Sequence, residues 1–142
     1  MDTFDGAVRI SQSDIQPVVL SGRLNYKLVE EATTGAKSLG VGLVVVEPGG
    51  VCEPGDAHSD QEEALFCLSG EGVVIVGEAG LEIAIKPRDT VYIKPGTYHK
   101  LKNPHTSPLE VLWVISPGGW YFDRHPEEKA RAIAGQHSEG GC

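Results

Sequence analysis

Short runs of valine, isoleucine and leucine, separated by tight-turn residues, are the feature that most constrains the fold of this chain. Between residues 8 and 101 each apolar run lasts only a few residues, and helical spacing is absent. The chain has 18 glycines and 9 prolines in 142 residues, and these residues supply the positive φ and the fixed φ that turns require. Short strands joined by frequent turns predict an all-β sandwich or barrel.

The expected strands share this aliphatic composition and end at turn residues. They cover residues 18–20, 24–30, 39–47, 64–68, 72–76, 81–85, 90–93, 99–103 and 109–115. We expect one domain over residues 1–135, with its barrel at about 24–115. Residues 126–134 are predicted to form a short helix that starts at Pro126 and stops at Gly135, and residues 136–142 a flexible tail.

Charge and hydropathy exclude several classes of partner. Twenty acidic against twelve basic residues give a net charge of −8, which opposes binding to the phosphate backbone of nucleic acids. No stretch approaches the roughly 20 apolar residues that cross a bilayer, and the first residues lack the pattern of a signal peptide. We therefore expect no nucleic-acid partner, no membrane span and a cytoplasmic location. The three cysteines indicate neither a disulfide framework nor a zinc knuckle.

Metal-binding residue types gather in two separate segments. Asp56 and His58 are two residues apart, so an extended chain presents both on one face. Glu63 follows His58 by five residues, an odd interval, so the run 59–61 must bend the chain if the three converge. His99 begins a predicted strand just after a Pro-Gly turn. Two imidazoles with one or two carboxylates suit a divalent first-row metal with open coordination positions.

The spacing of the first segment resembles the first motif of the cupin superfamily. That motif has a glycine, five residues, His-x-His, three or four residues, a glutamate, six residues and a glycine. This chain has Gly50, five residues, Asp56-Ala57-His58, four residues, Glu63, six residues and Gly70.

The second segment resembles the second cupin motif: a glycine, five residues, Pro-x-Gly, two residues, a histidine, three residues and an asparagine. Here the corresponding residues are Arg88, Lys94-Pro95-Gly96, His99 and Asn103. The resemblance implies a double-stranded β-helix, or jelly-roll, barrel. Three positions depart from the family pattern, which has histidine at Asp56, glycine at Arg88 and proline at Lys94.

Carried over position by position, the resemblance implies the metal ligands Asp56, His58, Glu63 and His99, or only the last three. The last three form a two-histidine, one-carboxylate triad of the kind that holds non-haem iron. The implied cofactor is one divalent ion: iron, manganese or zinc. For Asp56, the alternative is a turn in which its carboxylate accepts hydrogen bonds from backbone amides. For the other three residues, the separate alternative is a metal-free polar network.

Residue counts and strand alternation predict which side chains near the first motif face inward. Glu62 competes with Glu63, but the six-residue count to Gly70 selects Glu63 and turns Glu62 outward. Leu65 and Cys67 share the face of Glu63 and are expected to line the interior. Cys67 is interpreted as a small buried hydrophobe rather than a reactive thiol.

The resemblance implies a metal-dependent enzyme that acts on a small polar organic molecule, with dioxygenase chemistry preferred over isomerase or lyase chemistry. The alternative is a non-catalytic cupin that binds a sugar or small acid as a sensor. Small cupins commonly pair, so the resemblance also implies a homodimer. The apolar run Trp120–Phe122 either covers the barrel mouth or forms an interface, and the interface is preferred.

Overall fold

The structure, a computed structural model, describes residues 1–119. The predicted helix 126–134, the tail 136–142 and the apolar run 120–122 lie outside the described residues. Within them, no helix is long and apolar enough to cross a membrane.

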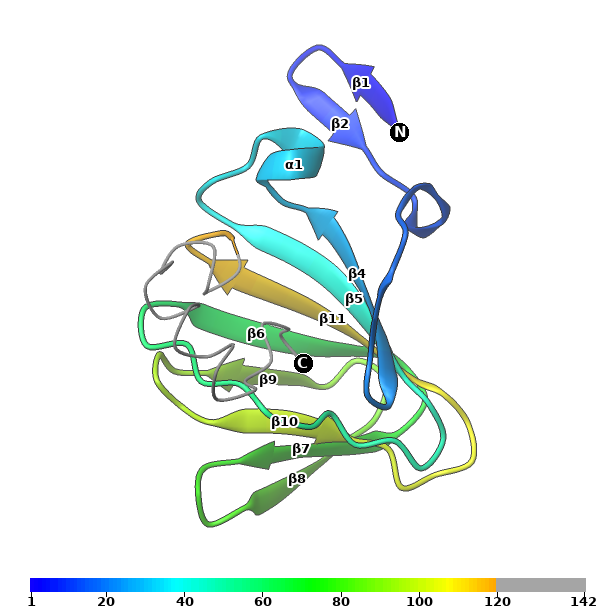
Figure 1. Cartoon of the computed structure of the whole chain (residues 1–142), viewed down its shortest axis with the longest axis vertical. Coiled ribbons are helices and arrows are strands. Elements are labelled where there is room, and N and C mark those ends of the chain that lie inside the picture. The colour runs from blue at the N-terminus through cyan, green and yellow to red at the C-terminus, as the bar shows by residue number, and fades with distance from the viewer. Residues whose placement is uncertain (120–142) are drawn as a thin grey trace.

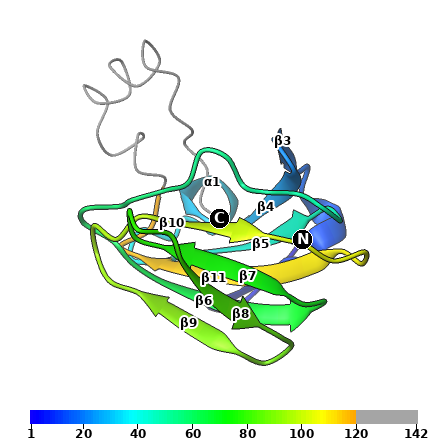
Figure 2. The same cartoon turned by 90° about the horizontal axis from the view of Figure 1, so that it is seen from below.

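Two antiparallel sheets form the body of the molecule (Figures 1 and 2). The larger has the order β3-β4-β5-β11-β6-β9, and the smaller has the order β10-β7-β8. The bounds are β3 Val18–Leu20, β4 Arg23–Val29, β5 Gly40–Val46, β6 Glu62–Ser69, β7 Gly72–Val76, β8 Leu81–Ile85, β9 Thr90–Ile93, β10 His99–Lys102 and β11 Leu109–Ser116. The all-β jelly-roll prediction is confirmed.

The segment between β5 and β6 extends the smaller sheet along β10. Isolated bridges pair Val51 with Lys102 and Asp56 with His99. The second bridge is a complete antiparallel rung, because the amide of each residue donates to the carbonyl of the other at 2.9 Å. The first predicted metal segment is therefore bonded directly to the second.

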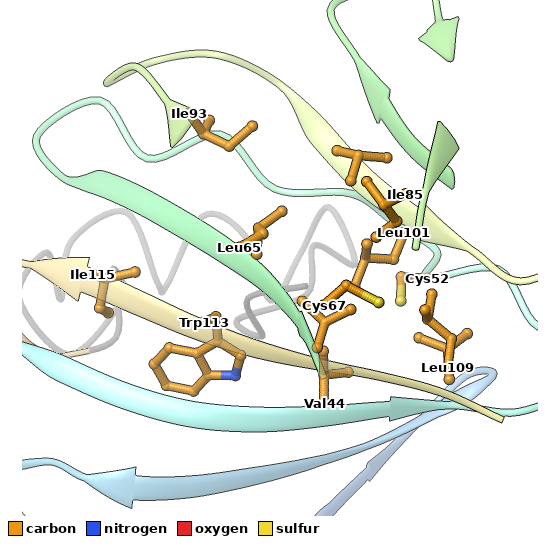
Figure 3. Packing of buried hydrophobic residues seen from close by; sticks show 13 residues of the cluster. Val44, Cys52, Leu65, Cys67, Ile85, Ile93, Leu101, Leu109, Trp113 and Ile115 are labelled. Atoms are coloured by element: carbon orange, nitrogen blue, oxygen red, sulfur yellow. The ribbon is translucent and has the colours of Figure 1, made fainter. Parts of the chain in front are cut away.

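Alternation along the strands places an apolar core between the two sheets (Figure 3). In β11 the buried side chains are Leu109, Val111, Trp113 and Ile115. Leu65 and Cys67 of β6 join the same cluster, which confirms that they face inward with Glu63. A Cβ on Gly42 would meet the Trp113 ring at 2.0 Å, so only glycine fits opposite this tryptophan.

Four short elements precede or interrupt the barrel strands. They are β1 Asp2–Phe4, β2 Ala7–Arg9, the 3-10 turn η1 Gln12–Asp14 and the one-turn helix α1 Glu31–Thr34. All residues of β1 and β2 are exposed, and neither helical turn contains a buried residue. Without a buried face, none of the four carries the apolar periodicity on which the sequence prediction depends.

Candidate metal centre

Three of the four predicted ligands converge inside the barrel. Each of His58, Glu63 and His99 offers one ligand atom, and the three atoms lie within 4.8 Å of one another. Their exposed fractions are 8%, 2% and 1%. Glu63 comes from β6 of the larger sheet and His99 from β10 of the smaller one, while His58 lies in the connection before β6. The cluster therefore joins both sheets.

A turn at Ser59 and Asp60 brings His58 and Glu63 to the same side of the chain. The bend required by their odd spacing is thus present. The amide of Gly96 donates to the carbonyl of His58 at 2.7 Å, so the Pro-Gly turn before His99 also holds the backbone of the first histidine. The two motifs fix each other's position.

The ring of His99 is oriented by its own turn. Its Nδ1 lies 2.9 Å from the carbonyl oxygen of Thr97, and its Nε2 lies 2.5 Å from Glu63 Oε1. A carbonyl only accepts, so Nδ1 carries a proton and donates it. In the neutral ring, Nε2 then presents its lone pair toward the cluster.

The pKa of His99 reflects two opposing influences. Burial lowers it, but the hydrogen bond and charge of Glu63, the Thr97 carbonyl and the charge of Asp56 together raise it above its usual value. The surroundings of this ring therefore favour a positive charge, whether a proton or a cation supplies it.

Glu63, rather than Glu62, faces the interior. Both carboxylate oxygens of Glu63 are buried, and Oε1 lies 2.5 Å from His99 Nε2. Glu62 is exposed and accepts a hydrogen bond from the Tyr92 hydroxyl at 2.5 Å. The choice made by residue count therefore agrees with the burial of the two side chains.

Asp56 lies beside the cluster but outside its three residues. It is 5% exposed and forms a direct antiparallel pair with His99, so both side chains lie on the same face of the smaller sheet. The structure therefore brings Asp56 to the site. Its role as a fourth ligand remains a prediction.

The two other departures from the cupin pattern fall in turns. Arg88 has a φ of 79°, and the Asp89 amide donates to the Lys86 carbonyl at 3.0 Å. With Pro87 before it, Arg88 occupies the position of a type II turn that favours glycine. Lys94 begins a similar turn in which Gly96 has a φ of 80°. Both departures are therefore matters of turn geometry.

Gln61 is a buried polar residue of this region to which the sequence reasoning gave no role beyond the bend. It is 2% exposed and bonds the chain just after β11. The only available signal was its position two residues before Glu63, which places both on one face of an extended chain.

Residues 42–115, just over half of the chain, match the Cupin domain family. The chain is a cupin. It is also 27% identical over 116 residues to the tetracenomycin polyketide synthase protein TcmJ of Streptomyces glaucescens, covering 81% of this chain and 75% of that protein.

Solved cupin structures resemble this one in fold. A predicted oxalate decarboxylase of Thermotoga maritima matches with a TM-score of 0.67 and 23% identity, over 78% of this chain and 99% of that one. The polyketide cyclase RemF of Streptomyces resistomycificus matches with a TM-score of 0.67 and 20% identity, over 78% and 79% of the two chains. At these identities the likeness establishes the fold alone.

Proposed function

We propose that this cupin is a metal-dependent enzyme that acts on a small polar organic molecule, with oxygenation as the favoured reaction. The observation that carries the proposal is the buried cluster of His58, Glu63 and His99, to which both sheets contribute.

The three residues fit a divalent ion. Two imidazoles and one carboxylate form the donor set typical of non-haem iron(II) oxygenases. The charge of a carboxylate buried away from water is costly, and a cation beside Glu63, which is 2% exposed, relieves that cost. When bound, such an ion supplies Lewis acidity toward a substrate oxygen and, as iron(II), reactivity toward dioxygen.

The remaining parts of the site are supplied by the chain itself. The Thr97 carbonyl orients the His99 ring, and Glu63 contributes the negative charge. Glu63 of β6 pairs with Ile115 of β11 on one side and with Ile93 of β9 on the other. Both isoleucine side chains are buried, so they exclude water from the two sides of the carboxylate. We assign the role of proton acceptor to Asp56, which lies on the face of His99.

A second candidate reaction involves no dioxygen. The related TcmJ carries the name of a polyketide synthase protein, and RemF, similar in fold, is a polyketide cyclase. Polyketides carry carbonyl groups whose adjacent carbons lose protons readily when the oxygen is polarised. This candidate assigns the ion a Lewis-acid role and the Asp56 carboxylate the role of base.

An oxygen-electrode screen with iron(II)-loaded and zinc-loaded protein separates these candidates. Hydroxy acids, catechols and 1,3-dicarbonyl compounds are the substrates to test. Oxygen uptake that needs iron, a substrate and Glu63 supports oxygenation, with Glu62→Gln as the control that retains activity. Turnover with zinc and no oxygen uptake supports the second candidate. Metal-free protein that binds sugars or acids without turnover contradicts both and favours a binding module.

A further inference from the structure

Gln61 joins the metal-binding loop to the end of β11. Its Nε2 donates to the carbonyls of Pro117 at 2.8 Å and Gly119 at 2.7 Å. The last rung between β6 and β11 pairs Glu62 with Ser116, so the amide of Gln61 adds one more connection beyond the backbone ladder. This connection lies between His58 and Glu63 in the sequence.

The amide is kept buried at an energetic cost. Gln61 Oε1 is buried and has no hydrogen-bond partner among the described residues. A buried acceptor left unpaired loses the hydrogen bond that water would give it, and this loss is unfavourable. Because Nε2 uses both of its hydrogens on two carbonyls, the role of the side chain in these contacts is donation.

The segment that Gln61 holds is itself fixed to the barrel. The Gly118 amide donates to the Lys37 carbonyl at 2.9 Å, and a Cβ on Gly118 would meet the Leu39 carbonyl oxygen at 2.5 Å. The chain therefore packs tightly there against the connection before β5. The two carbonyls that receive the Gln61 amide belong to an anchored segment.

We propose that Gln61 is a positioning residue of the metal centre. It fixes the end of the loop after His58 and the start of β6, and so sets the distance between His58 and Glu63. This inference rests on the proposed metal-dependent function, because it concerns the same ligands. Residues that support metal ligands typically change metal affinity by 10- to 100-fold when replaced.

The test measures Zn²⁺ affinity by competition with a fluorescent chelator, at a temperature at which circular dichroism shows every variant folded. Gln61→Met removes both donors at similar volume, and Gln61→Asn keeps an amide that is too short to reach both carbonyls. Both are expected to bind Zn²⁺ at least tenfold more weakly than wild type. Gln12→Met, the same change at an exposed glutamine, is expected to leave the affinity unchanged.

Asn103→Ala provides the control for general destabilisation, because its hydrogen bonds lie away from the cluster. It is expected to lower Tm but to leave the Zn²⁺ affinity of the folded protein unchanged. Affinity unchanged in both Gln61 variants, or lowered equally in Asn103→Ala, overturns the role of Gln61. Wild-type protein that binds no Zn²⁺ overturns the metal centre itself, and the inference with it.

Discussion

At the scale of single residues, His99 is the candidate ligand with the most support around it. Its backbone pairs with Asp56, its Nδ1 contacts Thr97 and its Nε2 faces Glu63. We predict that His99→Ala abolishes metal retention while the β-sheet spectrum in circular dichroism persists. Elemental analysis after dialysis measures the loss, and His105→Ala, at an exposed histidine, is the control. Metal content equal to wild type would remove His99 from the site.

Arg88 gives a prediction about stability. An L-residue in the left-handed region costs about 1–2 kcal/mol, which glycine avoids at a smaller entropic cost. Arg88→Gly is expected to raise the free energy of unfolding by about 0.5–1 kcal/mol in urea titration. Glu71→Gly, at an exposed position without positive φ, is expected to lower it. A destabilised Arg88→Gly protein contradicts this account of the turn.

Individual site residues were predictable from the sequence to different degrees. Glu63 was separable from Glu62 because spacing and strand alternation decide which side chain faces inward. The distance of Asp56 from the other three was not predictable, because it depends on the bend between the segments. The contacts of Gln61 were not predictable either, since they join residues more than fifty positions apart.

At the scale of elements, the predicted barrel strands lie within two residues of the observed ones. Residues 18–20, 72–76, 81–85 and 90–93 agree at both ends. Short aliphatic runs bounded by turn residues are a reliable signal, and all four segments have flanking turns. The hairpin of β1 and β2 has no buried face, and its backbone pairing and the contact of Arg9 with Asp2 join its strands.

Asn103 connects β10, β5 and the loop before β11. Its Nδ2 donates to the carbonyls of Val46 at 3.1 Å and Ser107 at 2.8 Å, and its Oδ1 accepts from the His105 amide at 3.0 Å. Asn103 is 0% exposed, and Asn103→Ala leaves three backbone groups without this partner, of which the Val46 carbonyl is in a buried contact. We expect about 3 kcal/mol less stability in urea titration. A loss under 1 kcal/mol would show that water replaces the amide.

At the scale of the whole molecule, closure of the barrel predicts inert thiols. Cys52 and Cys67 are both 0% exposed. Burial is the main cause that raises the pKa of the Cys67 thiol, and the negative charges of Asp89 and Glu71 add to it. In a Cys142→Ser variant we expect thiol-specific reagents to react roughly 100-fold more slowly with native than with urea-unfolded protein. Rapid labelling of the native protein would show that the interior opens readily.

The sequence established the architecture of the molecule more fully than its chemistry. Two motif spacings indicated the barrel through their resemblance to the two cupin motifs. Motif spacing does not encode a reaction, because one fold hosts many different chemistries.

Anomalous diffraction from crystals of the purified protein, recorded above and below the iron absorption edge, tests the metal centre most directly. The account predicts one strong peak bounded by His58, Glu63 and His99, and the same map shows whether Asp56 reaches it. Crystals in which these side chains surround only water, or in which the ion lies elsewhere, would contradict the metal centre.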